Sequence, residues 1–145
     1  MIDLYTWHTP NGRKVSIMLE EIGMPYNTFP INIAKDEQFQ PHFLEVSPNN
    51  RIPAIVDKEN NNYSLFESGA ILMYLAEKSG KLINKSNSDE YYRTIEWLMW
   101  QMGGVGPMFG QVHHFVKYNK GKSAYAEERY SKEARRLYGV MDKRL

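Results

Sequence analysis

The sequence predicts an α/β domain followed by an all-helical region. In the first half, short runs of alternating apolar residues are interleaved with runs of helical spacing, in the order strand–helix–strand–helix–strand–strand–helix. That order implies a mixed four-stranded sheet with helices packed against it. After about residue 88 only helical spacing recurs. We therefore expect one domain over residues 1–79, a polar linker over 80–88 and a helical domain over 89–145.

The first strand and helix are the clearest elements. Apolar and polar residues alternate from Ile2 to Trp7, which is typical of a strand. Thr9–Gly12 is a turn sequence, and a helix follows until Gly23 and Pro25 end it. The apolar positions of this helix fall on one face, at Val15, Met18, Leu19 and Ile22.

The middle of the chain predicts three more strands. Phe29, Ile31 and Ile33 alternate, but Pro30 between them restricts this strand to a sheet edge. Residues 35–46 predict a short, irregular helix interrupted near Pro41. Residues 53–57 and 63–66 predict an antiparallel hairpin, and a helix over 67–79 follows.

The second half predicts two long helical stretches. One starts near Asn87, with Glu90 in the capping-box relation to it. The sequence Gly103–Pro107 should bend or break this helix. After a loop over 117–122, a last helix starts near Ala124 with an apolar stripe at Tyr130, Ala134, Leu137, Tyr138, Met141 and Leu145.

Composition excludes several classes of function. Among 145 residues the formal net charge is +1, so no global field indicates a nucleic-acid or membrane partner. Cysteine is absent, which excludes disulfides, Cys-ligated zinc and a protein-borne thiol. His113 and His114 are adjacent, about 100° apart on a helix, so they cannot share a metal. With no membrane span and no signal sequence, a cytoplasmic protein without a metal is expected.

Asn49–Asp57 and the start of the 67–79 helix predict a binding edge. If the Ile52–Pro53 bond is cis, the chain turns sharply and the backbone N–H and C=O of Ile52 face outward, where an extended peptide could pair with them. Glu67-Ser68 opens a helix, whose N-terminus attracts anions. Together they would suit a small charged peptide. The alternative is a hairpin and a capped helix without a ligand.

These stretches resemble the glutathione-binding half of the glutathione transferases, and further motifs narrow the likeness to the bacterial nu class and its close relatives. The resemblance covers nearly the whole chain. The motifs that carry it are Ile2–Tyr5, Thr9–Val15, Asn49–Asp57, Leu65–Lys78, Trp100–Met108 and Gly110–Phe115.

The resemblance implies a thioredoxin-like fold for residues 1–79 and a homodimer of C2 symmetry. Members of the family continue through several further helices after the point where this sequence stops. The helical domain over 89–145 is therefore expected to be truncated, and the chain to be a fragment of a longer protein.

Without cysteine, sulfur chemistry would have to come from a bound thiol. Lowering a thiol pKa from about 8.5 to about 7 requires roughly 2 kcal/mol of preference for the thiolate. One hydrogen bond to the charged sulfur supplies ~1.5–3 kcal/mol, and a helix N-terminus adds ~0.3–1 kcal/mol. Thr9 and Asn11 are placed to donate it, and the resemblance assigns them this catalytic role. Turn and cap chemistry is the alternative for both residues.

The resemblance also implies the residues that bind the rest of glutathione. The Ile52 backbone should pair with the cysteinyl part, and Glu67 and Ser68 should bind the γ-glutamyl amine and carboxylate. Gln38 is the candidate for the glycyl end. Arg129 should reach a glutathione carboxylate across the dimer, or else be a solvated helix arginine. The full predicted binding set is Gln38, Arg51, Ile52, Pro53, Glu67, Ser68 and Arg129.

The expected function is a glutathione-dependent transferase or thiol–disulfide oxidoreductase. The thiolate of bound glutathione would attack a small disulfide or another electrophile. The alternative is a binding or scaffold protein that keeps the fold and has lost catalysis, because fold does not imply function.

Overall fold

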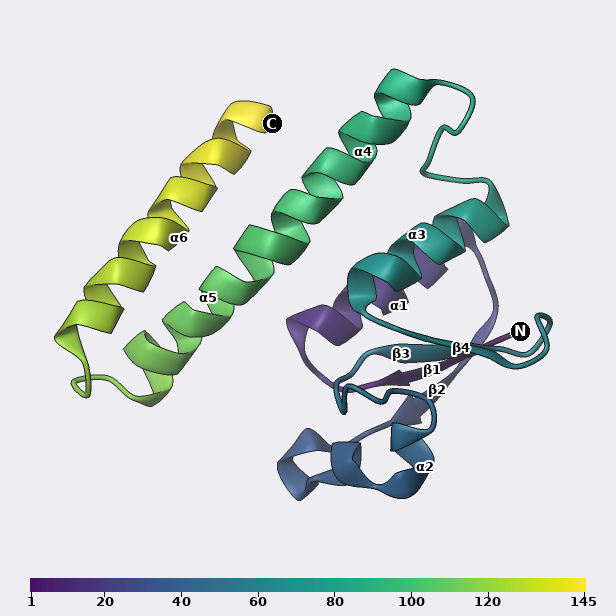
Figure 1. Cartoon of the computed structure of the whole chain (residues 1–145), viewed down its shortest axis with the longest axis horizontal. Coiled ribbons are helices and arrows are strands. Elements are labelled where there is room, and N and C mark those ends of the chain that lie inside the picture. Colours follow the sequence, from purple (N-terminus) through teal and green to yellow (C-terminus); the bar gives the residue numbers. More distant parts are fainter. The chain divides into compact units, whose positions relative to one another are not determined.

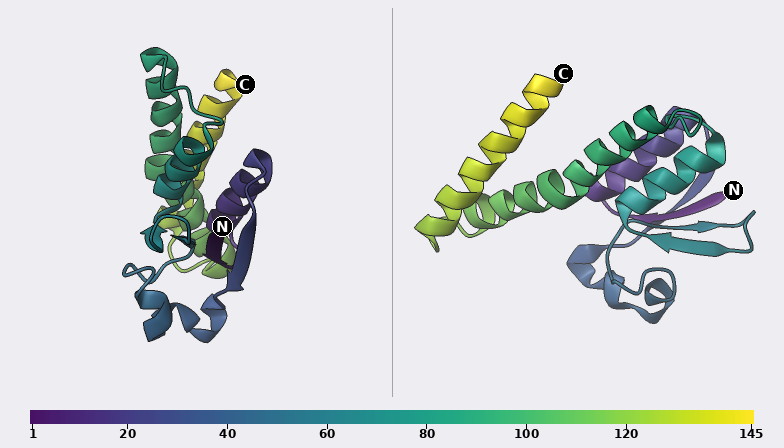
Figure 2. Two further views of the ribbon diagram at one scale, coloured as in Figure 1. Left: turned by 90° about the vertical axis from the view of Figure 1, so that its right-hand side faces the viewer. Right: turned by 45° about the horizontal axis from the view of Figure 1, so that its top comes forward.

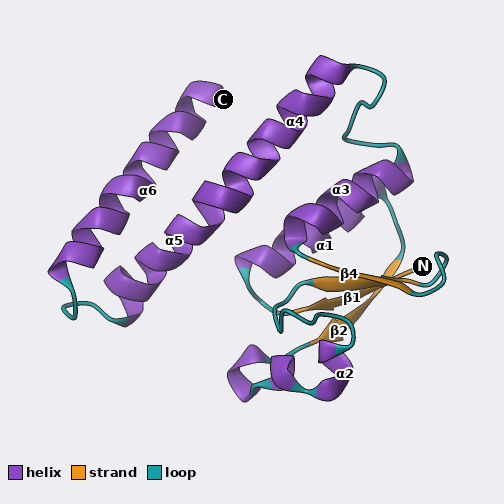
Figure 3. Ribbon diagram, in the orientation of Figure 1, coloured by secondary structure: helices purple, strands orange, loops and turns teal.

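A computed structural model describes all 145 residues and confirms the α/β sheet followed by helices (Figure 1, Figure 3). The sheet order is β2-β1-β3-β4, with β1 parallel to β2 and the other two pairings antiparallel, so the sheet is mixed as predicted. The elements of this part are β1 Ile2–Thr6, α1 Pro10–Ile22, β2 Tyr26–Pro30, α2 Pro41–Leu44, β3 Ala54–Asp57, β4 Tyr63–Phe66 and α3 Ser68–Ser79. This is the thioredoxin-like arrangement.

Two apolar clusters lie on opposite faces of the sheet. The α1 and α3 helices cover one face, and the α2 segment lies on the other (Figure 1, Figure 2). The larger cluster joins the apolar face of α1 to β1 and α3 through fully buried residues such as Leu4, Leu19 and Leu75. The smaller one packs Phe43 against Ile31 and Ala54. Each fully buried aliphatic or aromatic side chain contributes ~1.5–3 kcal/mol, so the predicted face of α1 anchors this unit.

Gly12 lets the first turn of α1 lie directly on the end of β1. A Cβ at this position would lie 2.3 Å from Thr6 Oγ1 and 2.5 Å from the Trp7 carbonyl oxygen. No real side chain tolerates such distances, and the Trp7 carbonyl cannot move away because it also accepts the Thr9 N–H at 2.7 Å. Only glycine therefore allows this approach of helix to strand.

A buried carboxylate fixes the hairpin to α3. Asp57 is fully buried and accepts hydrogen bonds from the Tyr74 hydroxyl at 2.6 Å and the Glu59 N–H at 3.0 Å. It also forms an ion pair with Lys78 at 2.8 Å. Burial by itself would raise the pKa of Asp57, but the hydrogen bonds from Lys78, Tyr74 and the Glu59 backbone outweigh it and hold that pKa below its ordinary value.

The segment after β2 differs from the expectation in detail. The strand covers Tyr26–Pro30 at the sheet edge, earlier than the predicted alternation at 29–33. It ends there because the Asn32 side chain accepts the Ala34 N–H at 3.0 Å and starts a 3₁₀ turn, Ile33–Lys35. A second 3₁₀ turn, Glu37–Phe39, precedes α2, so the predicted irregular helix is three short pieces.

The helical part contains α4 Ser88–Trp100, α5 Gly106–Val112 and α6 Ala124–Arg144, with α6 running back antiparallel beside α5 (Figure 1). Asn87 and Ser123 cap α4 and α6 through their side chains. The predicted interruption at Gly103–Pro107 takes the form of a π-helical segment, Gln101–Val105, so the helix continues. The Gly106 N–H bonds the Gln101 carbonyl, and Pro107 falls in the first turn of α5, where its missing N–H is tolerated.

A second π-helical segment, His113–Tyr118, carries the chain past residue 117, where the loop had been expected to start. Contacts group the whole chain into two compact units, Met1–Tyr91 and Tyr92–Leu145. The boundaries expected at 79 and 89 stay a prediction. None of the helices combines the length and the hydropathy needed to cross a membrane.

Gly12→Ala should lower the free energy of unfolding by about 2 kcal/mol or more, because overpacking against backbone costs ~1–3 kcal/mol. Urea denaturation measures this change. Gly110→Ala in α5 is the matched control: its Cβ would meet nothing within 4 Å, so stability should hold or rise by ~0.5–1 kcal/mol. Equal effects of the two substitutions would contradict the close approach.

Asp57→Asn should cost about 3 kcal/mol at neutral pH, because it leaves Lys78 without its buried partner. The pKa of Asp57 is lower in the folded protein than in the unfolded chain, where it is ~3.9. Its charge therefore stabilises the folded protein fully at pH values above ~3.9, and this stabilisation is lost as the pH falls through the folded pKa. The difference between the two proteins should therefore shrink in urea titrations below about pH 4. Glu133→Gln, which breaks a surface pair with Arg136, should cost under ~1 kcal/mol. A difference that stays constant down to pH 2 would refute this account of Asp57.

Candidate functional site

One groove of about 320 Å³ collects five of the predicted site residues. They come from the start of α1, from the 3₁₀ turn before α2 and from the loop before β3. Its lining is Thr9, Asn11, Ile33, Gln38, Asn50, Arg51 and Ile52. Segments that are up to 43 positions apart in the sequence thus converge on one groove.

The start of α1 presents hydrogen-bond donors to this groove. Thr9 is the N-cap residue, and its Oγ1 accepts the Gly12 N–H at 3.2 Å. A hydroxyl that accepts one bond still has its own proton to donate, so the cap and a ligand-holding role are compatible. Asn11 is exposed, and its amide makes no hydrogen bond within the chain. Two neutral donors therefore stand at the positive end of a 13-residue helix.

The loop before β3 presents open backbone. The Ile52–Pro53 peptide bond is cis, Pro53 is buried and β3 begins at Ala54. Neither the N–H nor the C=O of Ile52 bonds another part of the chain. Buried Ser47 holds the loop in place, because its hydroxyl donates to the Arg51 carbonyl at 2.8 Å. An extended ligand could pair with Ile52 as an added strand does.

Gln38 brings a buried polar group to the groove. Its side chain is 7% exposed, and its Nε2 donates to Asp36 Oδ1 at 3.4 Å. Its Oε1 is buried without a hydrogen-bond partner. Leaving such an acceptor unpaired costs ~1–3 kcal/mol, so a ligand that donates a proton here would be bound more tightly.

Glu67 and Ser68 lie at the start of α3, outside the residues that line the groove. Ser68 is buried, whereas Glu67 is exposed. The backbone of Glu67 has φ 72° and ψ 112°, a conformation that residues other than glycine rarely adopt. The Asn49 amide donates to the Glu67 carboxylate at 3.3 Å, next to groove residue Asn50. Burial lowers the pKa of Lys14, one turn after Asn11, although the Glu67 charge acts in the opposite direction. Glu67 is thus tied by a hydrogen bond to the loop that contains Asn50, Arg51 and Ile52.

Tyr5 and His8 are close in sequence to Thr9, but neither lines the groove. Tyr5 stacks on Phe29 with ring centroids 5.0 Å apart, so it packs within the sheet. His8 lines a separate depression of about 230 Å³, called here the Arg13 pocket, which is formed by Leu4, Thr6, Trp7, His8, Gly12, Arg13, Ser16, Thr28 and Pro30.

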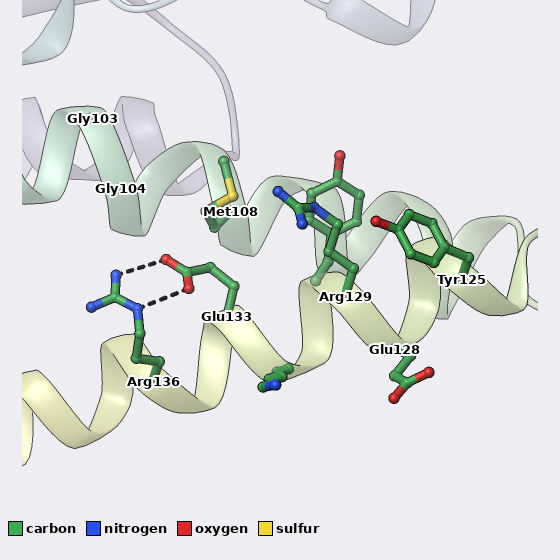
Figure 4. A pocket seen from close by; sticks show the side chains of 10 residues that line it. Gly103, Gly104, Met108, Tyr125, Glu128, Arg129, Glu133 and Arg136 are labelled. Atoms are coloured by element: carbon green, nitrogen blue, oxygen red, sulfur yellow. Dashed lines mark hydrogen bonds and ion pairs between the residues drawn. The ribbon is translucent and has the colours of Figure 1, made fainter.

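Arg129 lies in the second unit and lines a pocket of about 790 Å³ between α5 and α6 (Figure 4). Nearby Glu133 holds Arg136 in a two-point contact at 2.7 and 2.8 Å, while Arg129 makes no ion pair. Arg129 and the groove thus belong to different compact units. Its predicted contact with glutathione across a dimer stays a prediction.

Sequence reasoning missed two residues that hold the site together, Ser47 and Asn49. Ser47 and Asn49 pin the loop and Glu67 through contacts between distant positions, which no local pattern reveals. One sequence signal for this tight loop was available. Asparagine favours the left-handed backbone conformation, and Asn50 adopts it with φ 47°.

The arrangement suits an extended ligand that carries negative charge. Neutral donors, an arginine and open backbone line the groove, and no acidic side chain does. With no cysteine in the chain, any thiol in this place would belong to the ligand. No group of His, Asp or Glu residues is arranged to hold a metal ion.

Comparisons with known proteins agree with this geometry. Residues 1–77 match the family model "Glutathione S-transferase, N-terminal domain". The chain is 50% identical over 149 aligned positions to the disulfide-bond oxidoreductase YfcG of Escherichia coli, covering all of this chain and 69% of that protein. It superimposes with a TM-score of 0.93 and 54% identity on a Pseudomonas fluorescens glutathione transferase family member with two glutathione molecules bound. A Pseudomonas putida glutathione transferase with one glutathione disulfide per subunit gives a TM-score of 0.91 and 48% identity.

The chain spans only part of these proteins. Both structural matches cover nearly all of this chain, 98% and 99%, but 64% of the solved chain in each case. The similarity therefore bears on the thioredoxin-like part and the first helices that follow it.

Proposed function

Because this chain belongs to the glutathione transferase family, we propose that it binds glutathione in the Thr9–Ile52 groove and uses the glutathione thiolate to reduce a small disulfide. The observation that carries the proposal is the convergence of Thr9, Asn11 and Ile52 on one groove free of acidic side chains. Relatives named disulfide-bond oxidoreductases and relatives with bound glutathione support the same reading.

The reaction proceeds by thiol–disulfide exchange in two steps. The thiolate of bound glutathione attacks one sulfur of the disulfide, a new S–S bond forms, and the other half leaves as a thiolate. A second glutathione thiolate then attacks the glutathione sulfur of the mixed disulfide, which releases glutathione disulfide and the second thiolate. Two glutathione molecules supply the two electrons, and the protein supplies no redox group. Conjugation to an electrophile uses the same thiolate.

Thr9 and Asn11 stabilise the thiolate in this account. Both donors are neutral, so they favour the charged sulfur without competing for its proton. A hydrogen bond to a charged acceptor contributes ~1.5–3 kcal/mol, and the α1 N-terminus adds ~0.3–1 kcal/mol. The sum covers the roughly 2 kcal/mol needed to bring a thiol pKa near 7.

The remaining residues bind the rest of the peptide. The open backbone of Ile52, set by Pro53, pairs with the cysteinyl unit, and Glu67 and Ser68 bind the amine and carboxylate of the γ-glutamyl end. Arg51 and Gln38 also line the groove, and Gln38 is proposed to bind the glycyl end. A cytoplasmic location follows, because the cytosol maintains the reduced glutathione that the reaction consumes.

The proposed assembly is a C2 homodimer. Large apolar side chains are exposed on α4 and α6, among them Met99, Tyr125 and Tyr138. Arg129 makes no ion pair with its own chain. In the proposed dimer the Arg129 guanidinium meets a glutathione carboxylate bound by the partner.

Asn11→Ala should lower kcat/KM for glutathione-dependent reduction of 2-hydroxyethyl disulfide by about tenfold or more, since a donor to a charged sulfur is lost. Thr9→Ala should lose activity to a similar extent and also stability, because it removes the N-cap. Thr9→Ser keeps the hydroxyl and the cap and serves as the control.

Unchanged activity in both alanine variants would remove the assignment of the thiolate-holding residues. Calorimetric titration with glutathione separates the rival function: binding without turnover would indicate a scaffold protein. A flat titration would contradict the glutathione site itself.

Arg129→Gln should weaken glutathione binding about tenfold, because a guanidinium–carboxylate contact is lost. Arg135→Gln removes the same charge from the exposed surface of α6 and should leave the affinity within twofold. Sedimentation velocity gives the assembly state of each sample. A monomer that binds glutathione as tightly as before would contradict both the dimer and the role of Arg129.

A further inference from the structure

The Arg13 pocket is a second depression beside the groove. It lies where parallel strands β1 and β2 end, at Thr6 and Pro30, and its other wall is the first part of α1. Ligands of α/β folds bind outside the carboxyl ends of parallel strands. Its volume of about 230 Å³ falls below the ~300–1,000 Å³ of a typical ligand pocket, so it fits one end of a ligand.

The pocket is basic, although the unit that contains it carries a net negative charge. Residues 1–91 carry twelve acidic and eight basic side chains, yet no acidic side chain lines the pocket. The unit has two arginines, and one lines each depression: Arg51 the groove and Arg13 the pocket. Arg13 makes no ion pair, whereas Lys58, Lys78 and Lys85 of the same unit do.

The other polar groups of the pocket add donors around the guanidinium. Thr28 brings a hydroxyl, and His8 adds a ring N–H. The Ser16 hydroxyl donates to the Arg13 carbonyl at 3.1 Å, which fixes this turn of α1. A planar guanidinium fork matches a carboxylate, which accepts two parallel N–H bonds.

The pocket and the groove share a wall. Gly12 presses against Thr6 and Trp7, and the Arg13 N–H bonds the Thr9 carbonyl at 3.0 Å. Thr9 and Asn11 line the groove, while His8 and Arg13 line the pocket. Thr9 and Arg13 are thus one turn of α1 apart, about 5.4 Å along the helix axis. We take this span to be within reach of a disulfide that reacts with a sulfur held at Thr9.

We propose that the Arg13 pocket binds a carboxylate of the second substrate, so that the preferred disulfides carry carboxylates. This inference rests on the proposed function. The reaction is the exchange described above: the glutathione thiolate attacks the near sulfur, the S–S bond of the substrate breaks, and the far half leaves as a thiolate. Arg13 takes no part in the electron transfer. It is a specificity residue that holds the charged end.

The first test is binding in the absence of turnover. With the groove filled by S-methylglutathione, which has no free thiol, 3,3′-dithiodipropionate is titrated by calorimetry against the full chain. The account expects saturable binding that Arg13→Gln weakens about tenfold or more and Arg13→Lys weakens less. No binding, or equal binding by the Arg13→Gln variant, would overturn the proposal.

The second test compares turnover of two disulfides. Wild type should show a higher kcat/KM for 3,3′-dithiodipropionate than for uncharged 2-hydroxyethyl disulfide, and Arg13→Gln should lower that ratio about tenfold. Lys120→Gln removes the same charge from the exposed loop after Tyr118 and should leave the ratio unchanged. A ratio that Arg13→Gln does not alter would overturn the proposal. Absence of turnover with both disulfides would instead contradict the proposed function, and the binding titration would still decide the pocket.

Discussion

The first turn of α1 lies on the end of β1 at a distance that only glycine permits, and the rest of the site depends on this contact. Gly12 allows the helix to begin here, because a Cβ at this position would overlap with Thr6 and Trp7. The position of the turn then places Thr9 and Asn11 on one side and Arg13 on the other. The conformation of the turn Thr-Pro-Asn-Gly thus determines where the donors of the groove and the donors of the Arg13 pocket lie.

Neutral donors suit the proposed chemistry better than a charged base would. A thiol in the groove needs only a modest preference for its ionised form, about the strength of one hydrogen bond to a charged atom. A general base would remove the thiol proton during the reaction, whereas a hydrogen bond to the charged sulfur lowers the thiol pKa itself. The acidic character of residues 1–91 makes the lack of carboxylates in both depressions informative, since each carboxylate there would oppose a thiolate or a carboxylate ligand.

Much of the fold could be predicted because local rules agreed with the tertiary structure. The α1 face, the 53–66 hairpin and the start of α6 each carried a periodicity and a cap or turn signal that the structure confirms. The strand before Ile33 and the glycine-rich stretch after Trp100 were less predictable, because an Asn32 side chain and a π-helical segment decided them. The residues of the candidate site were predicted from family motifs. The supporting residues Ser47 and Asn49 were not predicted, because their contacts join distant segments.

The central claim is that the groove at the start of α1 holds glutathione as a thiolate. The most direct measurement is the ultraviolet absorbance of the thiolate, followed as the complex of the chain with glutathione is titrated with pH. The account predicts a thiol pKa near 7, about 1.5 units below the ordinary value of ~8.5. A bound glutathione that titrates at its ordinary value, with no thiolate signal at lower pH, would contradict it.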